Sequence, residues 1–526
     1  MKRTMIAIAA TTILFIQAAQ AAGAQAAGPQ VTVAQGGLEG VHDYTVDSFK
    51  GIPFAAPPTG ALRWRAPQPA AAWPGVRVAD HFAPDCMQQT VPWTEAPSTV
   101  KPSEDCLYLN VWRPAGSQVA QKLPVMVWIH GGGFVNGGTS PALYDGTSFA
   151  RDGVICVSVN YRLGRFGFFG FPALTKENAD HGDLGNYAFM DQIAALKWVR
   201  DNIAAFGGDP DNVTIFGESA GGMSVHALLT SPEAKGLFKR AIIQSGLGRS
   251  GPDGPRRLSG EEDQKTNKSS AEAIGVNFAR LRGIDGTDAA ALARLRALPA
   301  EAVSGDLSLA AGTTEKETFA SAMVDGQVVA ETAEAAYAAG HINAEAILIG
   351  ANTADAGKGH AASKDALFAT FGPLATRARQ AYDPDGAMSL DALNQAVGAD
   401  AEMVEPARMT AQYAAAHGVS VYAYRFGYVA SQKRAASPLG VPHAAELPFV
   451  FETLDARYGE LATAEDHDMA RRTHAAWVAF AKGQAPWTAW TPAGDAVMMF
   501  TPDAQTVVEP DPLKARLDVT EAKAEN

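Results

Sequence analysis

Short apolar runs of strand length recur along the chain, separated by longer stretches with helical spacing. The runs lie at residues 123–129, 154–159, 213–216, 240–244, 346–349 and 419–426. Several are continuously apolar rather than alternating, which is typical of strands that helices cover on both faces of a sheet. The pattern predicts an α/β fold with a large, mostly parallel central sheet flanked by helices.

Residues 187–206 show the clearest helical pattern. Their apolar positions follow helical spacing, and the stretch ends at two glycines, a common stop signal: Ile193, Leu196, Val199, Ile203, Gly207 and Gly208. The alanine-rich stretches 289–302 and 330–340 favour helices by propensity. Residues 251–270 are polar, lack apolar periodicity and predict a surface loop.

The N-terminus has the pattern of a signal peptide. Lys2 and Arg3 precede an apolar run that reaches Ile16, and small residues follow. A membrane anchor is the competing interpretation, but the run is shorter than the roughly 20 residues that a span needs. We expect a signal peptide over 1–22, with cleavage after Ala21, Ala22 or Ala26, and a single domain with helical insertions over 23–526. The mature protein should then be exported, either periplasmic or secreted.

Composition narrows the class of protein further. The chain of 526 residues is 47% hydrophobic and 19% charged, and its net charge of -13 is spread along the sequence. These values predict a globular protein with a sizeable core and argue against a nucleic-acid partner. A second long apolar run is not apparent, so no stable membrane anchor is expected. We found no metal-binding spacing or nucleotide loop, so no cofactor is implied, and the oligomeric state is left open.

The chain has three cysteines: Cys86, Cys106 and Cys156. An oxidising compartment favours a disulfide between Cys86 and Cys106, with Cys156 as a buried small hydrophobe. Such a bond would stabilise the fold by about 3 kcal/mol in the chain-entropy model. Three unpaired thiols are the alternative.

A candidate nucleophile lies between a strand and a helix. The apolar residues 213–216 run into Gly217-Glu218-Ser219-Ala220-Gly221, after which the sequence suits a helix. G-x-S-x-G in this context is the nucleophile elbow of a serine hydrolase, in which small residues permit a strained turn. A bland glycine-rich turn is the alternative, but the strand and helix on either side favour Ser219 as the nucleophile.

An elbow needs donors for the oxyanion that forms when Ser219 attacks. His130-Gly131-Gly132-Gly133-Phe134 directly follows an apolar strand. We expect the backbone N–H groups of Gly132 and Gly133, together with that of Ala220, to form the oxyanion hole. The alternative, a flexible glycine linker, does not suit the strand and aromatic residue that flank it.

These motifs, with others, resemble the type B carboxylesterase family, which includes bacterial esterases, animal carboxylesterases and cholinesterases. The resemblance covers nearly the whole mature chain and rests on F-K-G-I-P-F-A from residue 49, E-D-C-L-Y-L-N from 104, H-G-G-G-F from 130, N-Y-R from 160 and F-G-G-D-P from 206. It implies an α/β-hydrolase that cleaves a small-molecule carboxylic ester. It also implies a bond between the cysteine before E-D-C-L and the cysteine within it.

Triad partners should follow the serine in the order acid, then histidine. His443 lies in V-P-H-A-A-E-L-P-F, which resembles the family's catalytic histidine segment, and we assign it as general acid/base. The family often has glycine where this chain has Ala444. Asp355 falls where the family normally has a glutamate, and we expect it to orient the histidine. Glu315 and Glu317 are the nearest alternatives, whereas His360 and His417 suit solvated loops.

Other residues have weaker assignments. Glu218 matches a family position near the triad, where a supporting role and a purely structural one are equally expected. Five aromatic residues are candidates to line the substrate pocket, although plain core positions are commoner: Trp93, Phe134, Phe166, Phe168 and Phe169. Arg249 is a candidate to bind an acid group on the substrate, against the alternative of a surface arginine.

The alternative functions are a specialised esterase for a bulky or polyacid ester, suggested by Arg249, and a non-catalytic binding member of the same fold. The retained Ser219 and His443 argue against the latter.

Overall fold

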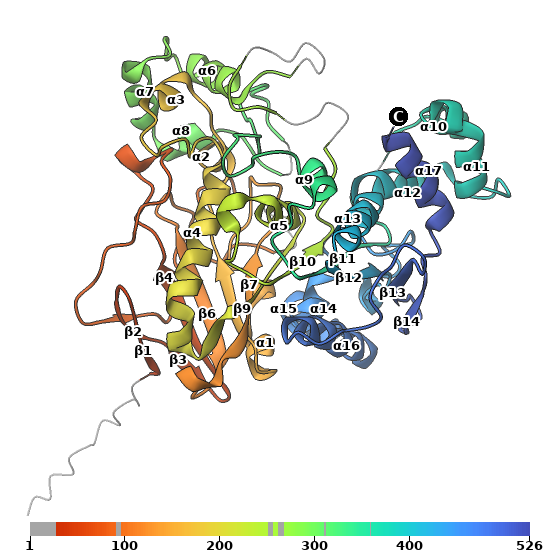
Figure 1. The fold of residues 1–526 in the computed structure, drawn as a ribbon, viewed down its shortest axis with the longest axis horizontal. Coiled ribbons are helices and arrows are strands. Elements are labelled where there is room, and N and C mark those ends of the chain that lie inside the picture. The colour runs from red at the N-terminus through yellow and green to blue at the C-terminus, as the bar shows by residue number, and fades with distance from the viewer. Residues whose placement is uncertain are drawn as a thin grey trace, which may run out of the picture.

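The computed structural model describes residues 28–90, 96–250, 256–260, 268–309, 312–357 and 359–525. The predicted signal peptide and most of the predicted loop 251–270 lie outside these residues. Within them the chain forms a small sheet ordered β1-β2-β5 and an eleven-stranded sheet ordered β14-β13-β12-β11-β10-β9-β7-β8-β6-β4-β3. The fold is therefore α/β, built around one large mixed sheet (Figure 1).

The strands are β1 Gln30–Val33, β2 Gly36–Glu39, β3 Val41–Asp43, β4 Val46–Pro53, β5 Val76–Val78, β6 Tyr108–Pro114, β7 Leu123–Ile129, β8 Ile155–Val159, β9 Gly208–Glu218, β10 Arg240–Gln244, β11 Ala346–Asn352, β12 Ser420–Phe426, β13 Ala496–Phe500 and β14 Thr506–Pro510. The seven strands from β8 to β13 in the sheet order pair in parallel, and the pairings toward both edges are antiparallel. All six apolar runs noted in the sequence belong to this parallel region.

The helices are α1 Thr147–Arg151, α2 Gly164–Gly167, α3 Pro172–Glu177, α4 Tyr187–Asn202, α5 Ala220–Thr230, α6 Ala271–Leu281, α7 Ala289–Arg296, α8 Ala300–Ser304, α9 Ala333–Ala339, α10 Lys364–Ala369, α11 Ala375–Tyr382, α12 Leu390–Ala399, α13 Glu405–Ala416, α14 Leu447–Val450, α15 Leu454–Tyr458, α16 Ala464–Ala481 and α17 Lys514–Ala524. The expected helix over 289–302 is two helices, α7 and α8, because Pro299 breaks the alanine-rich stretch.

Strand β7 shows how the sheet divides the core. Val127 and Ile129 belong to the hydrophobic cluster that includes residues of α4 and α5, whereas Met126 and Trp128 belong to the cluster that includes residues of α1 and α16. Alternate side chains of a strand point to opposite faces, so continuous apolar sequence is needed where helices cover both faces. Figure 1 shows α4 and α5 across one face of β7 and β9.

This topology positions the site. Because neighbouring strands from β8 to β13 are parallel, their carboxyl ends meet at one edge of the sheet. The loops that follow β7, β9, β10, β11 and β12 carry the residues described next.

Candidate active site

Ser219 occupies a tight turn between β9 and α5. Its backbone has φ 57° and ψ −124°, a strained conformation for a residue with a side chain. An added Cβ on Gly221 would lie 2.0 Å from the carbonyl oxygen of Ile129, and one on Gly217 would lie 2.5 Å from the Gly221 carbonyl. The glycines of the pentapeptide are therefore required by close backbone contacts.

The glycine loop after β7 touches this turn. An added Cβ on Gly131 would lie 3.1 Å from the Cβ of Ser219. The N–H groups of Gly132, Gly133 and Ala220 donate no hydrogen bond to any of the residues that the structure describes. Backbone N–H groups at the start of a helix or in a loop need a partner from outside that element. These three donors are therefore available to an oxyanion beside Ser219.

The same loop is held from outside by Asn136. Its side-chain amide donates to the Gln89 carbonyl at 2.8 Å, and its oxygen accepts the Leu309 N–H at 2.7 Å. Its own N–H donates to the Gly132 carbonyl at 3.0 Å. Asn136 thus fixes the glycine loop to two segments that are distant in sequence.

His443, in the loop after β12, lies between two carboxylates. Its Nδ1 is 2.5 Å from Oδ1 of Asp355, and its Nε2 is 3.1 Å from Oε1 of Glu218. No hydrogen bond joins the ring to Ser219 Oγ in the described part of the chain; catalytic hydrogen bonds often tighten only once substrate is bound. Ala444, at the family's glycine position, has φ 62°, which explains why glycine suits that position.

Asp355 is buried and accepts several hydrogen bonds. Its Oδ2 accepts from the Ser245 hydroxyl at 2.6 Å and from the Asn352 N–H at 2.8 Å. Burial alone would raise the pKa of this carboxyl, but the charge of His443 and these hydrogen bonds outweigh burial and lower it. Asp355 therefore stays ionised while it holds the imidazole.

The backbone brings Asp355 to His443 despite the short aspartate side chain. Ala354 bridges to Pro442, and the Ala354 N–H donates to the Val441 carbonyl at 2.9 Å. The loop after β11 is thus bonded directly to the histidine loop, which supplies the closer approach that aspartate needs in place of glutamate.

Glu218 has the opposite environment. It is buried, and apart from the His443 ring at 3.1 Å its Oε1 has no polar partner among the described residues. Burial raises the pKa of Glu218, although the charge of His443 opposes the shift. For His443, burial alone would lower the pKa, but the carboxylates of Glu218 and Asp355 raise it.

Ser245 and Glu446 also belong to the site, although no sequence pattern indicated a role for either residue. Glu446 is buried, its two oxygens accept from the side-chain amides of Gln244 at 2.9 Å and Asn352 at 2.7 Å, and burial raises its pKa. The only signal for Ser245 was its place directly after a strand; for Glu446 it was its place three residues after His443.

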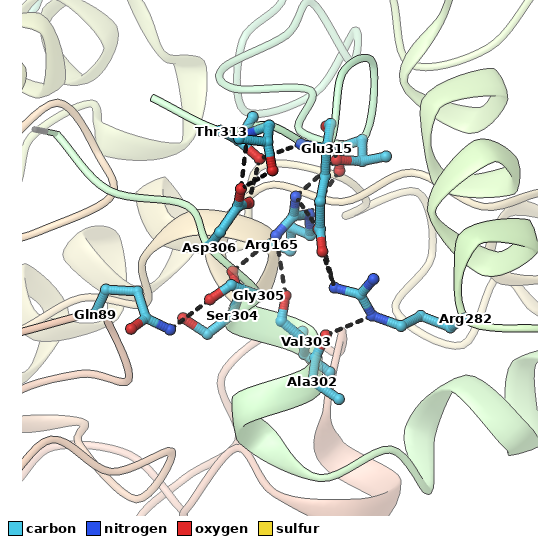
Figure 2. Close-up of polar contacts among 12 residues, drawn as sticks. Gln89, Arg165, Arg282, Ala302, Val303, Ser304, Gly305, Asp306, Thr313 and Glu315 are labelled. Atoms are coloured by element: carbon cyan, nitrogen blue, oxygen red, sulfur yellow. Dashed lines mark hydrogen bonds and ion pairs between the residues drawn. The ribbon is translucent and has the colours of Figure 1, made fainter. Parts of the chain in front are cut away.

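The alternative acids lie elsewhere. The Glu315 carboxylate binds Arg165 Nη2 at 2.9 Å and Arg282 Nη2 at 2.8 Å, within a cluster that also binds the Ser304 carbonyl (Figure 2). Glu315 is thus committed to two arginine side chains and does not contact His443. Glu317 is exposed.

The structure bears on the two predictions about the substrate pocket, namely its aromatic lining and the role of Arg249. Phe134, Phe166, Phe168 and Phe169 are all buried in the main hydrophobic cluster, as in the core alternative, and Trp93 lies outside the described residues. Arg249 is not free to bind a substrate acid, because its Nε and Nη2 bind the two oxygens of Glu405 at 2.7 Å and 2.6 Å.

Expectations from the sequence also concerned the cysteines, metal ligands and membrane-spanning helices. Cys86 and Cys106 form a disulfide, and Cys156 is a buried free thiol. Among the residues with described positions, no group of three His, Cys, Asp or Glu side chains is placed to hold a metal ion. Of the helices that the structure describes, none has the length and apolar character to cross a membrane.

Comparison with known proteins agrees with this geometry. The family model described as "Carboxylesterase family" matches residues 27–370 and 358–514. Para-nitrobenzyl esterase of Bacillus subtilis (strain 168) is 34% identical over 508 residues, which cover 92% of this chain and 96% of that protein. Fumonisin B1 esterase of Sphingopyxis macrogoltabida is 34% identical over 469 residues, covering 86% of this chain and 81% of that protein.

Solved structures are similar as well. A structure of PNB esterase superposes with a TM-score of 0.76 at 34% identity, covering 93% of this chain and 99% of that one. The large mixed sheet, flanked by helices, is thus that of an α/β-hydrolase. The chain belongs to the carboxylesterase family, and the protein is a carboxylic ester hydrolase.

Proposed function

We propose that the protein hydrolyses small-molecule carboxylic esters through an acyl-enzyme on Ser219. His443 takes the proton of the Ser219 hydroxyl as the oxygen attacks the ester carbonyl, and then gives a proton to the leaving alcohol. Water then attacks the acyl-enzyme. His443 takes a proton from the water and returns one to Ser219 Oγ as the carboxylic acid is released. The single observation that carries the proposal is the Asp355–His443 hydrogen bond at the sheet edge where the Ser219 turn lies.

Charge develops at two places during this reaction. The oxyanion would accept hydrogen bonds from the N–H groups of Gly132, Gly133 and Ala220. Each such donor stabilises the transition state by about 3 kcal/mol. The imidazolium of His443 would be stabilised by Asp355, which stays ionised. The Ser219 hydroxyl must hydrogen-bond to Nε2 of His443, which lies 3.1 Å from Glu218 Oε1. We therefore infer that the contact between Glu218 and Nε2 breaks when substrate is bound.

A short series of p-nitrophenyl esters tests the proposal. Ser219→Ala should lose turnover by about 10⁴-fold or more, and an organophosphate should add once, at Ser219, by mass spectrometry. Ser224→Ala, which removes a hydroxyl from the same helix, is the matched control and should keep most of the activity. A folded protein with neither turnover nor an adduct would instead support the non-catalytic binding alternative.

We further propose that the protein is exported to the periplasm or medium after removal of residues 1–22. The Cys86–Cys106 disulfide supports this, because such bonds persist in oxidising compartments. The mass of the protein recovered from the periplasmic fraction would test both the export and the cleavage position.

A further inference from the structure

The loop that carries Asp355 is bonded to a helix as well as to the histidine loop. The side-chain amide of Gln395, a half-buried residue of α12, donates to the backbone carbonyl of Asp355 at 2.5 Å. The Ala354 N–H donates to the Val441 carbonyl of the histidine loop. The chain is thus fixed to the histidine loop one residue before the acid, and to α12 at the acid itself.

The backbones of this loop and of α12 also touch directly. An added Cβ on Gly398 of α12 would lie 1.1 Å from the carbonyl oxygen of Gly357, and one on Gly357 would lie 2.5 Å from the carbonyl oxygen of Gly398. Gly357 also has φ 100°, a conformation that favours glycine. Because both residues are glycine, the loop lies against the helix with no side chain between the two backbones.

Asn394, the neighbour of Gln395, fixes the loop further along. Its carbonyl accepts the Gly359 N–H at 2.9 Å, and its side chain exchanges two hydrogen bonds of 3.1 Å with the backbone of Ala361. These bonds hold the chain that follows the acid, whereas the Gln395 bond is made to Asp355 itself.

A π-helical turn determines how α12 reaches the loop. This turn, Asp400–Val404, joins α12 to α13 in one continuous helix. Ala407 and Ala411 of α13 belong to the same hydrophobic cluster as Ile349 of β11, so α13 is packed on the sheet. A π-helical turn bends a helix and changes the face that it presents. The turn therefore sets the direction in which α12 leaves the sheet.

The turn is itself held by the C-terminal helices. Asp400 is 1% exposed, and its carboxylate accepts from the Tyr382 hydroxyl of α11 at 2.8 Å and from Nε of Arg516, on α17, at 2.8 Å. Met403 of the turn and Leu517 of α17 belong to one small hydrophobic cluster. Figure 1 shows α11, α12 and α17 gathered at one end of the molecule. This end of the molecule supports α12 from behind the loop.

An aspartate depends on such support more than a glutamate would. Asp355 reaches His443 with one methylene less than the usual acid of the family, and its Oδ1 lies 2.5 Å from Nδ1 of the ring. A side chain with one rotatable bond fewer cannot follow the ring when its backbone shifts. Since hydrogen bonds weaken steeply away from their preferred geometry, the position of the Asp355 backbone decides whether the acid orients the ring.

We propose that Gln395 is a positioning residue for catalysis: it fixes the backbone carbonyl of Asp355 to α12 and so keeps this short acid within hydrogen-bonding reach of His443. The proposal rests on the proposed esterase function and adds to it a residue outside the triad. Gln395 acts through Asp355 and not on the substrate, so its loss should lower kcat and leave KM nearly unchanged.

The test compares the loss of Gln395 in two backgrounds, with p-nitrophenyl acetate as substrate. Gln395→Met keeps the length of the side chain but removes the donor, and should lower kcat about tenfold, because small displacements of a catalytic group are costly. In the Asp355→Glu background the same change should lower kcat less than about twofold, since the longer acid can follow the ring. Gln395→Asn keeps the amide but cannot reach the carbonyl, and should behave like Gln395→Met.

Asn394→Ala is the matched control. It removes two hydrogen bonds between the same helix and the same loop, neither of which involves Asp355. It should lower the melting temperature at least as much as Gln395→Met does. Any loss of kcat that it causes should be equal in the wild-type and Asp355→Glu backgrounds, because it does not depend on the length of the acid.

The two possible failures are distinguishable. If the wild-type protein does not hydrolyse the ester, or if Ser219→Ala keeps the turnover, the proposed function fails together with this inference. If turnover depends on Ser219 but Gln395→Met and Gln395→Asn lower kcat equally in both backgrounds, or in neither, the positioning role of Gln395 alone is overturned.

Discussion

The two sides of the His443 ring present the same chemical group in opposite surroundings. On the Nδ1 side, Asp355 accepts hydrogen bonds from Ser245 and Asn352, and its pKa is lowered. On the Nε2 side, the Glu218 oxygen nearest the ring accepts no hydrogen bond from any other described residue, and burial raises the pKa of that carboxyl. Both carboxylates are buried beside the same ring, but only Asp355 also accepts hydrogen bonds from Ser245 and Asn352, whereas the charges of Glu446 and Asp355 add to the effect of burial on Glu218.

The Nδ1 side should give the largest effect. Asp355→Asn keeps the shape but removes the charge and favours the wrong imidazole tautomer, so we expect kcat to fall about 10⁴-fold at pH 7. Asp355→Glu, which restores the family's usual acid, should lose much less. Steady-state kinetics on p-nitrophenyl acetate would measure both, and full activity in Asp355→Asn would show that another group orients the ring.

The Nε2 side should appear in the pH profile. Neutral imidazole is the base, so kcat/KM rises as pH rises through the pKa of His443. Because the Glu218 carboxylate raises that pKa, Glu218→Gln should move the midpoint of this rise to lower pH by about one unit. Glu446→Gln is the matched control, since its carboxylate is already bound by amides, and should shift the midpoint less. Equal shifts in the two variants would contradict the comparison.

Stability should separate the two carboxylates as well. Burial raises the pKa of Glu218 from 4.5 to about 8. The contribution of protonated Glu218 to the free energy of unfolding is therefore fully present below pH 4.5 and is lost as pH rises through about 8. Glu218→Gln is neutral throughout and should melt about 2 °C higher than wild type at pH 9, with little difference at pH 4. Thermal unfolding at both pH values would measure this; a constant difference would argue against titration of Glu218.

The smallest effect concerns the backbone that holds the ring between the two carboxylates. Ala444 has φ 62°, where alanine is strained and glycine is not, so Ala444→Gly should stabilise the protein by about 1 kcal/mol. Ala445→Gly, one residue further and without a positive φ, should instead be neutral or destabilising. Denaturant unfolding of both variants would decide, and equal losses of stability would refute the strain argument.

The sequence predicted the parallel centre of the sheet better than its edges. Strands β7 and β10 have the predicted bounds, because strands buried on both faces need continuous apolar sequence. The outer strand β14 was not predicted, since its residues are largely exposed and leave no apolar run. Packing on neighbours, not local sequence, determines such a strand.

The residues of the site likewise fall into those that the sequence predicted and those that it did not. The Ser219 turn and the glycine loop are contiguous motifs, since steric contacts of the backbone dictate their glycines. Ser245 and Glu446 are single polar residues whose neighbours carry no pattern, and only the register of β10 against β11 brings Ser245 to Asp355. The pairing of Arg249 with Glu405 joins residues that are distant in sequence, and so could not be inferred either.

The thiol arrangement makes the protein convenient to label. Cys86 and Cys106 are bonded to each other, and burial raises the pKa of the third thiol, Cys156, so that it stays protonated and unreactive. The native chain therefore offers no reactive thiol that would compete for a maleimide dye. A dye attached to a cysteine at Leu309, which is 53% exposed and lies beside Gly133, would report substrate arrival next to the glycine loop.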